Sequence, residues 1–351
     1  MIVMYIGLSE KRCTEYINNL NAILILLMVI GHFTEQCING SGVAKSIFLF
    51  IYAFHMPLFL FIDGLTCQHI LQNKKTVIAH SLYFFLLYVV YKVVIFFIKM
   101  ISTGNASFEL LTESGVPWYV FTLALYYPIA YLIKASSYAK RMFILIFSVV
   151  LALICGYCDA IGDFFVLSRS IVFFPFFLAG YYIEEAEKVS RFTGKLWIRV
   201  LGAYILLLVL FICFRSIDAF YFMRPIFTGR NSYKVLKESF YAGAAYRLLA
   251  YGISISMSIG IMAFTPRQNV KIFEKIGQKT LQIYFWHRPV LYVLVYCGVF
   301  KKLEQLAGWR GGRVIWLALG ICLTFILSLD CFGKPLNWLY QILMPKHPKE
   351  K

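Results

Sequence analysis

The sequence has few charged residues. Asp, Glu, Lys and Arg make up only 15% of its 351 residues, whereas soluble domains carry about 25%. Hydrophobic residues make up 60%, above the about 45–50% of soluble domains. A globular core of ordinary size cannot bury this excess, so the composition excludes an ordinary soluble domain and indicates a membrane protein.

Acidic residues are the scarcest charged class, with 17 Asp and Glu against 34 Lys and Arg, for a net charge of +17. In a soluble protein this balance would favour a nucleic-acid partner. Here no basic stripe with interleaved aromatic residues lies outside the apolar runs, so we expect no nucleic acid. Basic residues beside apolar runs contact anionic lipid, and membrane lipid is the partner that they predict.

Several motifs are also missing. No linker rich in Pro, Gly or Ser divides the chain, so we expect one domain over residues 1–351. The sequence has no H-E-x-x-H and no histidine pair four residues apart, so we expect no metal site, and the absence of G-x-S-x-G excludes a nucleophile elbow. Cys155 and Cys158 have redox spacing but lie in an apolar run, where cysteine behaves as a small hydrophobe.

Apolar runs long enough to cross a bilayer recur along the whole chain. They predict an all-α, polytopic membrane bundle of about ten transmembrane helices and a long non-spanning joint at residues 214–246. If both termini face the cytoplasm, the joints on the cytoplasmic side carry more Lys and Arg than the joints on the outer side. We therefore expect an N-in, C-in chain. The expected spans are residues 16–36, 44–66, 77–98, 117–133, 142–159, 169–184, 196–213, 247–264, 280–299 and 313–332.

The first run carries a polar stripe. At helical spacing, Asn18, Asn21 and His32 share one face with Ile25 and Met28. Polar groups in hydrocarbon are costly without partners or a wet cavity, so this face is expected to line the bundle interior. The alternative is structural: the asparagines start the helix and His32 bonds a neighbouring helix.

The second run, FHMPLFLFIDG, adds His55 and Asp63. Pro57 frees a backbone carbonyl and bends the helix, which often accompanies a binding site in a membrane bundle. The alternative for Asp63 is an interfacial carboxylate that accepts a hydrogen bond from Lys74 or Lys75.

A late run, LQIYFWHRPVL, places His287 and Arg288 inside an expected span. An arginine at that depth must pair, snorkel or line water, and its guanidinium clamps phosphate or carboxylate well. The alternative is an ion pair that serves assembly alone.

Together these runs resemble a known family. NNLNAILILLMVIGH, FIYAFHMPLFLFIDG, FFPFFLAGYYIEE and GQKTLQIYFWHRPVL, in this order, resemble the integral-membrane acyltransferase family 3. That family includes bacterial O-acetylases of surface polysaccharides. The resemblance implies an enzyme that moves an acyl group from a cytoplasmic acyl-CoA, usually acetyl-CoA, to a hydroxyl of a glycan or lipid-linked sugar. It also implies a multi-pass protein of a bacterial cell membrane, with acyl-CoA as co-substrate and no bound cofactor.

By the same resemblance, His32 matches the family's essential histidine, and His55 and His287 match its later histidines. We expect His32 to act as the base or acyl relay, because the pKa of an imidazole lies near neutrality. His55 or Asn21 would orient the donor or polarise its carbonyl.

The chain departs from the family pattern at three places. Asn18 and Asn21 replace the acid and the basic residue of the first motif, and Asp63 stands where serine is usual. In the third span, where a basic residue and a proline are common, the residues are His80-Ser81-Leu82-Tyr83.

Further binding roles follow from charge and ring chemistry. Arg288, Lys74 and Lys75 would attract the phosphates of CoA. Trp118 would stack on a sugar ring, although interfacial aromatic belts use tryptophan in the same way. Asn18, Asn21 and Asp63 are further candidates for binding the donor.

Two other functions fit the same buried polar residues. A non-catalytic relative could transport a glycan, a lipid-linked sugar or a small solute, and the missing first-span cation favours this reading. A partner in a polysaccharide-synthesis complex, or in polysaccharide export, is the third possibility.

Overall fold

The computed structural model describes residues 8–344 except residues 114 and 184, with side chains from residue 12. Within this part of the chain the structure is helical, and no β-strand forms; one isolated bridge joins Thr112 and Phe164. The longer helices are α1 (Leu8–Thr34), α2 (Gly42–Tyr52), α3 (His55–Thr66), α4 (Lys74–Thr103), α5 (Trp118–Ile133), α6 (Tyr138–Ile154), α7 (Leu167–Ile183), α8 (Ala186–Thr193), α9 (Leu196–Arg215), α12 (Gly243–Phe264), α14 (Thr280–Tyr296), α15 (Val299–Leu327) and α16 (Asp330–Leu343). The short ones are η1 (Glu35–Cys37), η2 (Cys67–Gln72), η3 (Cys155–Tyr157), η4 (Asp159–Ile161), α10 (Ile217–Phe220), η5 (Tyr221–Met223), α11 (Arg224–Thr228), η6 (Tyr233–Ala242) and α13 (Lys271–Gly277).

Seven helical segments in the described residues are long and apolar enough to cross a membrane, and two shorter apolar helices, α5 and α7, accompany them. The predicted all-α, multi-pass membrane fold is therefore present, whereas the number of ten spans and the orientation stay predictions. The seven segments are Arg12–Cys37, Gly42–Gln72, Lys74–Thr103, Tyr138–Tyr157, Leu196–Arg215, Tyr233–Phe264 and Val299–Leu327.

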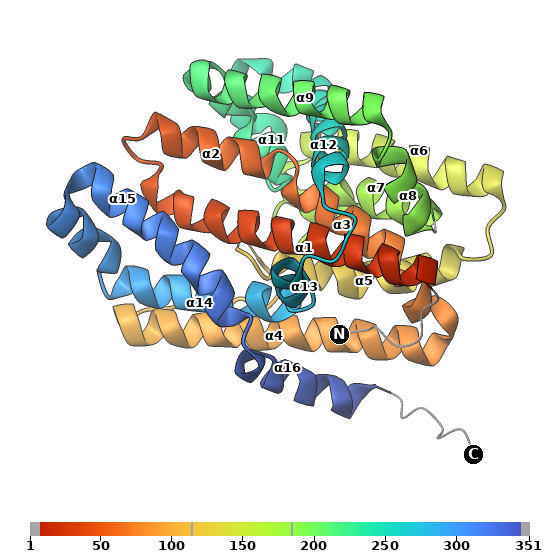
Figure 1. Ribbon diagram of the computed structural model, residues 1–351, viewed down its shortest axis with the longest axis horizontal. Helices are drawn as coiled ribbons and strands as arrows, with labels where there is room; N and C mark the ends of the chain where they lie inside the picture. Colours follow the sequence, from red (N-terminus) through yellow and green to blue (C-terminus); the bar gives the residue numbers. More distant parts are fainter. Residues whose placement is uncertain (1–7, 114, 184, 345–351) are drawn as a thin grey trace.

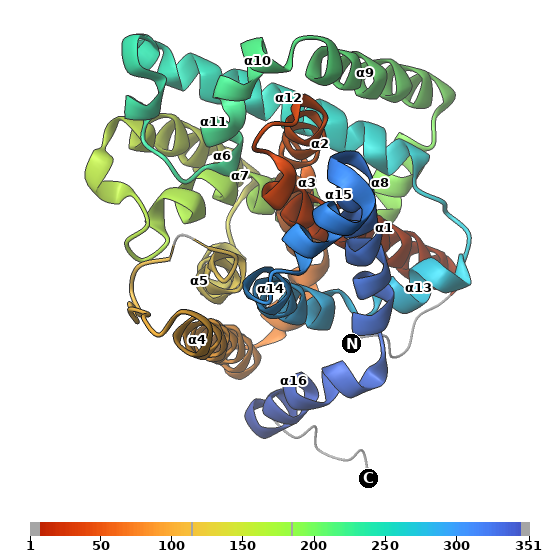
Figure 2. The same cartoon turned by 90° about the vertical axis from the view of Figure 1, so that its left-hand side faces the viewer.

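The first two segments form the centre of the bundle. Seen end-on, α1, α2 and α3 lie in the middle, with α4, α5 and α14 on one side and α9 and α12 on the other (Figure 2). The most apolar windows of these two central segments are 61% and 67% buried, against 17% for α4 and for α9. Since apolar side chains such as Leu207 and Phe211 on α9 are exposed, the outer helices present a lipid-facing surface.

The expected span over residues 44–66 is two helices rather than one. Pro57 has no N–H, and its ring would clash with the carbonyl of Ala53 in a continuous helix, so α2 ends at Tyr52 and α3 begins at His55. The freed carbonyl of Ala53 accepts a hydrogen bond from Ser254 Oγ of α12 at 2.5 Å. Where Pro57 predicted a bend, the helix breaks completely, and the break sets His55 at the start of a helix inside the bundle.

Two glycines let α3 and α7 pack backbone against backbone. A Cβ on Gly64 would overlap the carbonyl oxygen of Phe177, and a Cβ on Gly180 would overlap that of Phe61. This close approach fixes the position of α3, and with it His55 and Asp63.

The last third of the chain differs from the prediction. Residues 300–312, expected to be a joint, lie within α15, which is interrupted by a break at Gly308 with φ 73°. The expected span 313–332 ends at Leu327, and α16 follows, although the sequence had not predicted it. The beginning of α1 and the end of α16 lie on the same side of the molecule, opposite the connection between α1 and α2 (Figure 1).

Candidate active site

The polar stripe of α1 faces the interior. Asn21, Ile25 and Met28 line a small cavity of about 130 Å³, and Met28 and His32 line a larger one of about 670 Å³. Only the larger volume falls within the ~300–1,000 Å³ typical of ligand pockets. The two cavities lie in series along α1, because α1 rises ~1.5 Å per residue between Asn21 and His32.

His32 belongs to a hydrogen-bonded cluster that closes the end of α1. Its Nδ1 lies 3.1 Å from Glu35 Oε1, which also accepts a hydrogen bond from the hydroxyl of Tyr52 at 2.8 Å. Arg288 Nη1 donates to the other carboxylate oxygen, Oε2, at 2.6 Å. We assign a proton to His32 Nδ1 that Glu35 accepts, which leaves the Nε2 lone pair free. This is the base-and-orienting-carboxylate arrangement of acyl-transfer enzymes.

His287 packs against the ring of His32. The two rings stack with centroids 5.1 Å apart and planes at 29°. His287 Nδ1 donates to the carbonyl of Tyr284 at 2.6 Å, its Nε2 has no partner, and the side chain is fully buried. His287 lines neither cavity, so it can position His32 but cannot reach a ligand in this arrangement.

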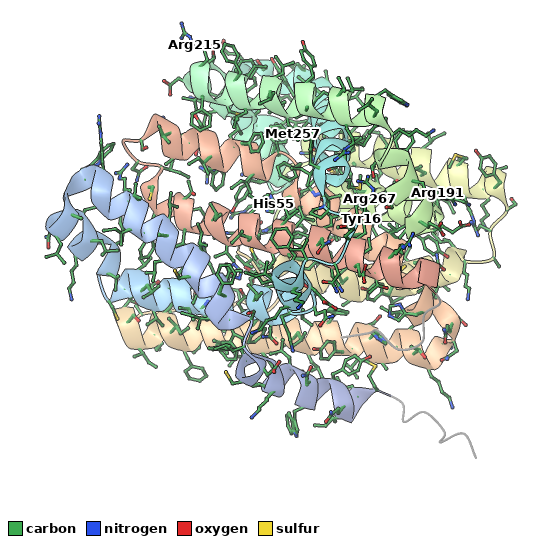
Figure 3. The ribbon with its side chains drawn as sticks, in the orientation of Figure 1. Tyr16, His55, Arg191, Arg215, Met257 and Arg267 are labelled. Carbon is green, nitrogen blue, oxygen red and sulfur yellow. The ribbon has the colours of Figure 1, made fainter. Side chains whose placement is uncertain are left out.

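His55 lies near the middle of the molecule, between Arg215 at one end and Arg191 toward the other (Figure 3). It lines the large cavity, and its ring meets that of Tyr52 edge-on at 4.7 Å. Its Nδ1 donates to the carbonyl of Ile51 at 2.9 Å, so neutral His55 presents a lone pair at Nε2. This lone pair can accept a hydrogen bond from a ligand hydroxyl, but it cannot donate one to a carbonyl oxygen.

The large cavity is both polar and aromatic. Besides His32 and His55 it is lined by Glu35, Trp118 and Arg288, and the exposed Asn39 connects its lining to the protein surface. Trp118 is only 8% exposed to solvent, and its ring stacks on Phe173 at 5.2 Å. Trp118 is therefore a cavity residue and does not belong to an interfacial belt.

The small cavity contains the polar groups Asn21, Asp63 and Thr280. Asp63 Oδ2 accepts a hydrogen bond from Tyr119 at 2.5 Å. The alternative in which Asp63 bonds Lys74 or Lys75 is therefore wrong, because α3 turns the carboxylate toward α5 rather than toward the exposed start of α4. Four residues line both cavities and so form the wall between them: Met28, Met56, Tyr119 and Tyr284.

The residues predicted for the site therefore do not all lie together. The large cavity has His32, His55, Trp118 and Arg288; the small cavity has Asn21 and Asp63; His287 lies behind His32; and Asn18, Lys74 and Lys75 line neither cavity. Asn18 instead packs its backbone against Gly277 of α13, where a Cβ would overlap the Asn18 carbonyl oxygen. Among the described residues no group of three His, Cys, Asp or Glu side chains could hold a metal ion.

Glu35 and Tyr52 belong to the site but were not predicted from the sequence. Glu35 follows His32 by three residues, the spacing that places two side chains on one helical face, so the pair was readable from the sequence. Tyr52 gave no such signal, because its contact depends on how α2 packs against α1.

A comparison with protein-family models matches residues 14–332 to the Acyl_transf_3 family, described as an acyltransferase domain. No curated protein and no solved structure shows significant similarity to the chain. The matched range contains every described residue that lines the two cavities, from Asn21 to Arg288. The chain therefore belongs to acyltransferase family 3.

Proposed function

We propose that this protein is a membrane O-acyltransferase. It would move an acyl group, acetyl in our proposal, from a cytoplasmic acyl-CoA to a hydroxyl of a cell-surface glycan or its lipid-linked precursor. The setting that we propose is the plasma membrane of a bacterium, beside polysaccharide-synthesis proteins. The observation that carries the proposal is the His32–Glu35 pair in the wall of the large cavity.

The chemistry needs a base for the attacking hydroxyl. His32 Nε2 would take the proton of the acceptor hydroxyl while its oxygen forms the ester bond with the thioester carbonyl carbon. Glu35 would stabilise the imidazolium that results. When the carbon–sulfur bond breaks, the same proton would pass to the leaving thiolate, so the base is restored.

The donor and the acceptor would approach from different cavities. The acceptor occupies the large cavity, where His55 Nε2 accepts a hydrogen bond from a second, non-reacting hydroxyl of the sugar and Trp118 offers a ring face. The donor reaches toward the large cavity through the small one, where the Asn21 amide can orient its pantetheine arm. Asn21 lies about 16 Å along α1 from His32, too far to polarise the carbonyl that is attacked beside His32. Lys74 and Lys75, exposed at the start of α4, would hold the CoA phosphates outside both cavities.

The test is a His32→Ala variant expressed in a host that lacks its own copy of the gene. Glycan-bound ester should disappear while the variant still reaches the membrane in normal amount. His69→Gln is the matched control, because His69 is partly buried but lines neither cavity. Normal ester content in the His32→Ala strain would refute the proposed base.

Transport is the competing function. It is supported by the two cavities in series along α1, which could also form a path for a solute through the bundle. Purified protein in liposomes separates the two. Acyl transfer consumes thioester in proportion to the ester formed, whereas a transporter, or a non-catalytic partner in polysaccharide export, consumes none.

A further inference from the structure

Arg224 is an arginine of the large cavity without an acidic partner. It begins α11, within the joint at residues 214–246, and lines the cavity. Its guanidinium lies over the rings of Phe48 and Tyr221, at 4.9 Å and 5.7 Å from their centroids. The guanidinium makes no hydrogen bond or ion pair with any residue that the structure describes.

Every other arginine of the cavity is paired. Arg288 binds Glu35. Arg230 makes a bidentate pair with Asp163 at 2.6–2.8 Å, and Arg169 reaches the same carboxylate at 3.4 Å. Arg169 also donates to the carbonyls of Glu113 and Gly115.

The charges around the cavity therefore do not balance. Among the residues that the structure describes, four arginines line it, but Glu35 is the only carboxylate in its lining, and Asp163 behind it serves both Arg169 and Arg230. The nearby Glu113 is paired with Lys92 at 3.1 Å. A guanidinium facing a partly enclosed cavity attracts an anion more strongly than one in water, because the effective dielectric constant is lower.

Arg224 is also close to the proposed base. Phe48, on which it lies, stacks on Tyr52 with ring centroids 3.7 Å apart. The Tyr52 hydroxyl in turn lies 3.1 Å from His32 Nδ1. An anionic group bound by Arg224 would thus be separated from His32 by the rings of Phe48 and Tyr52. Such a group would belong to the acceptor sugar itself or to the neighbouring sugar of the glycan. Asn39, Thr228 and Asn231 add hydrogen-bonding groups to the same cavity for sugar hydroxyls.

We propose that Arg224 binds a carboxylate or phosphate of the acceptor, so that the preferred acceptor is an anionic glycan. That the ligand is the acceptor rests on the proposed function, whereas the anion site itself does not. A planar guanidinium pairs with a carboxylate or phosphate through two hydrogen bonds. The anion could be a uronate of the glycan or the phosphate of a polyprenyl-linked sugar, and the experiment separates these two sources.

The experiment measures binding to purified full-length protein in lipid nanodiscs, with no acyl donor present. Three probes are compared: a glucose oligomer, a glucuronate oligomer of equal length and linkage, and a polyprenyl-diphosphate-linked disaccharide. We expect the wild type to bind at least one anionic probe about tenfold more tightly than the glucose oligomer, since hydrogen bonds to charged groups have about that effect. Which of the two is preferred identifies the source of the anion.

The Arg224→Gln variant should bind all three probes alike, and Arg224→Lys should keep part of the preference because it keeps the charge. Arg215→Gln is the matched control, since Arg215 is exposed at the end of α9 and lines neither cavity. A wild type without preference, or an Arg224→Gln variant that retains it, would overturn the proposal. Failure of the proposed function is a separate result: the wild type would then bind the anionic probe but transfer no acyl group to it.

Discussion

Replacing Glu35 by glutamine is a sharp test of the His32–Glu35 pair. The carboxylate accepts from His32 Nδ1 at 3.1 Å, from Tyr52 at 2.8 Å and from Arg288 at 2.6 Å. A glutamine keeps the shape, but its amide nitrogen can donate to His32 Nδ1 and hold the proton on Nε2. The imidazole would then lack its free lone pair on the cavity side and could not take a proton.

The size of the effect follows from the role of the base. General-base catalysis contributes about 10²–10⁴-fold, and the equivalent Asp-to-Asn change in a Ser-His-Asp triad lowers kcat about 10⁴-fold. We expect Glu35→Gln to lower kcat by about 10²–10⁴-fold and to leave both KM values within about threefold, because the proposed binding groups are His55 and Trp118 for the acceptor and Asn21 for the donor, while the Glu35 carboxylate is taken up by His32, Tyr52 and Arg288. The assay follows acetyl-CoA consumption with a glycan acceptor. Full activity at normal protein yield would refute the assigned role.

A stability measurement separates this role from a purely structural one. Arg288 is 14% exposed in its side chain, so Glu35→Ala leaves a largely buried cation unpaired, at a cost of about 3–5 kcal/mol. The double variant Glu35→Ala/Arg288→Met removes both charges and should recover much of the thermal stability while activity stays lost. Recovery of activity along with stability would mean that the pair serves assembly alone.

Two further predictions concern packing and the wall between the cavities. Gly180→Ala should lower the unfolding midpoint, at a cost of about 1–3 kcal/mol, because its Cβ would overlap the carbonyl of Phe61; Gly252→Ala, in open space on α12, should be neutral or stabilising. Tyr119→Phe removes the hydrogen bond to Asp63 and should raise the KM for acetyl-CoA by about tenfold with little change in acceptor KM. An effect on the acceptor alone would place the donor elsewhere.

Local patterns in the sequence anticipated much of this site. The helical spacing of α1 predicted that Asn21 and His32 share an interior face, and Pro57 predicted a bend at the place where the structure has a break between α2 and α3. Both follow from one segment's own geometry, in which side chains three and four residues apart share a face and proline lacks a donor.

What the sequence did not reveal depends on contacts between distant segments. Tyr52 reaches His32 only because α2 packs on α1, and Arg224 reaches the cavity only because α11 lies against the bundle. The position of the break at Gly308 was also not predicted, since three glycines lie in this polar stretch and the sequence does not by itself show which of them takes a left-handed conformation.

The most direct test of His32 as an acyl-transfer base uses purified protein in liposomes, with labelled acetyl-CoA outside and a glycan oligomer inside. Protein with its acyl-CoA face outward should move label into ester on the enclosed glycan, with one CoA released per ester formed, and His32→Ala should abolish both. Thioester consumption and ester formation that persist at the wild-type rate in the His32→Ala protein would show that the base lies elsewhere.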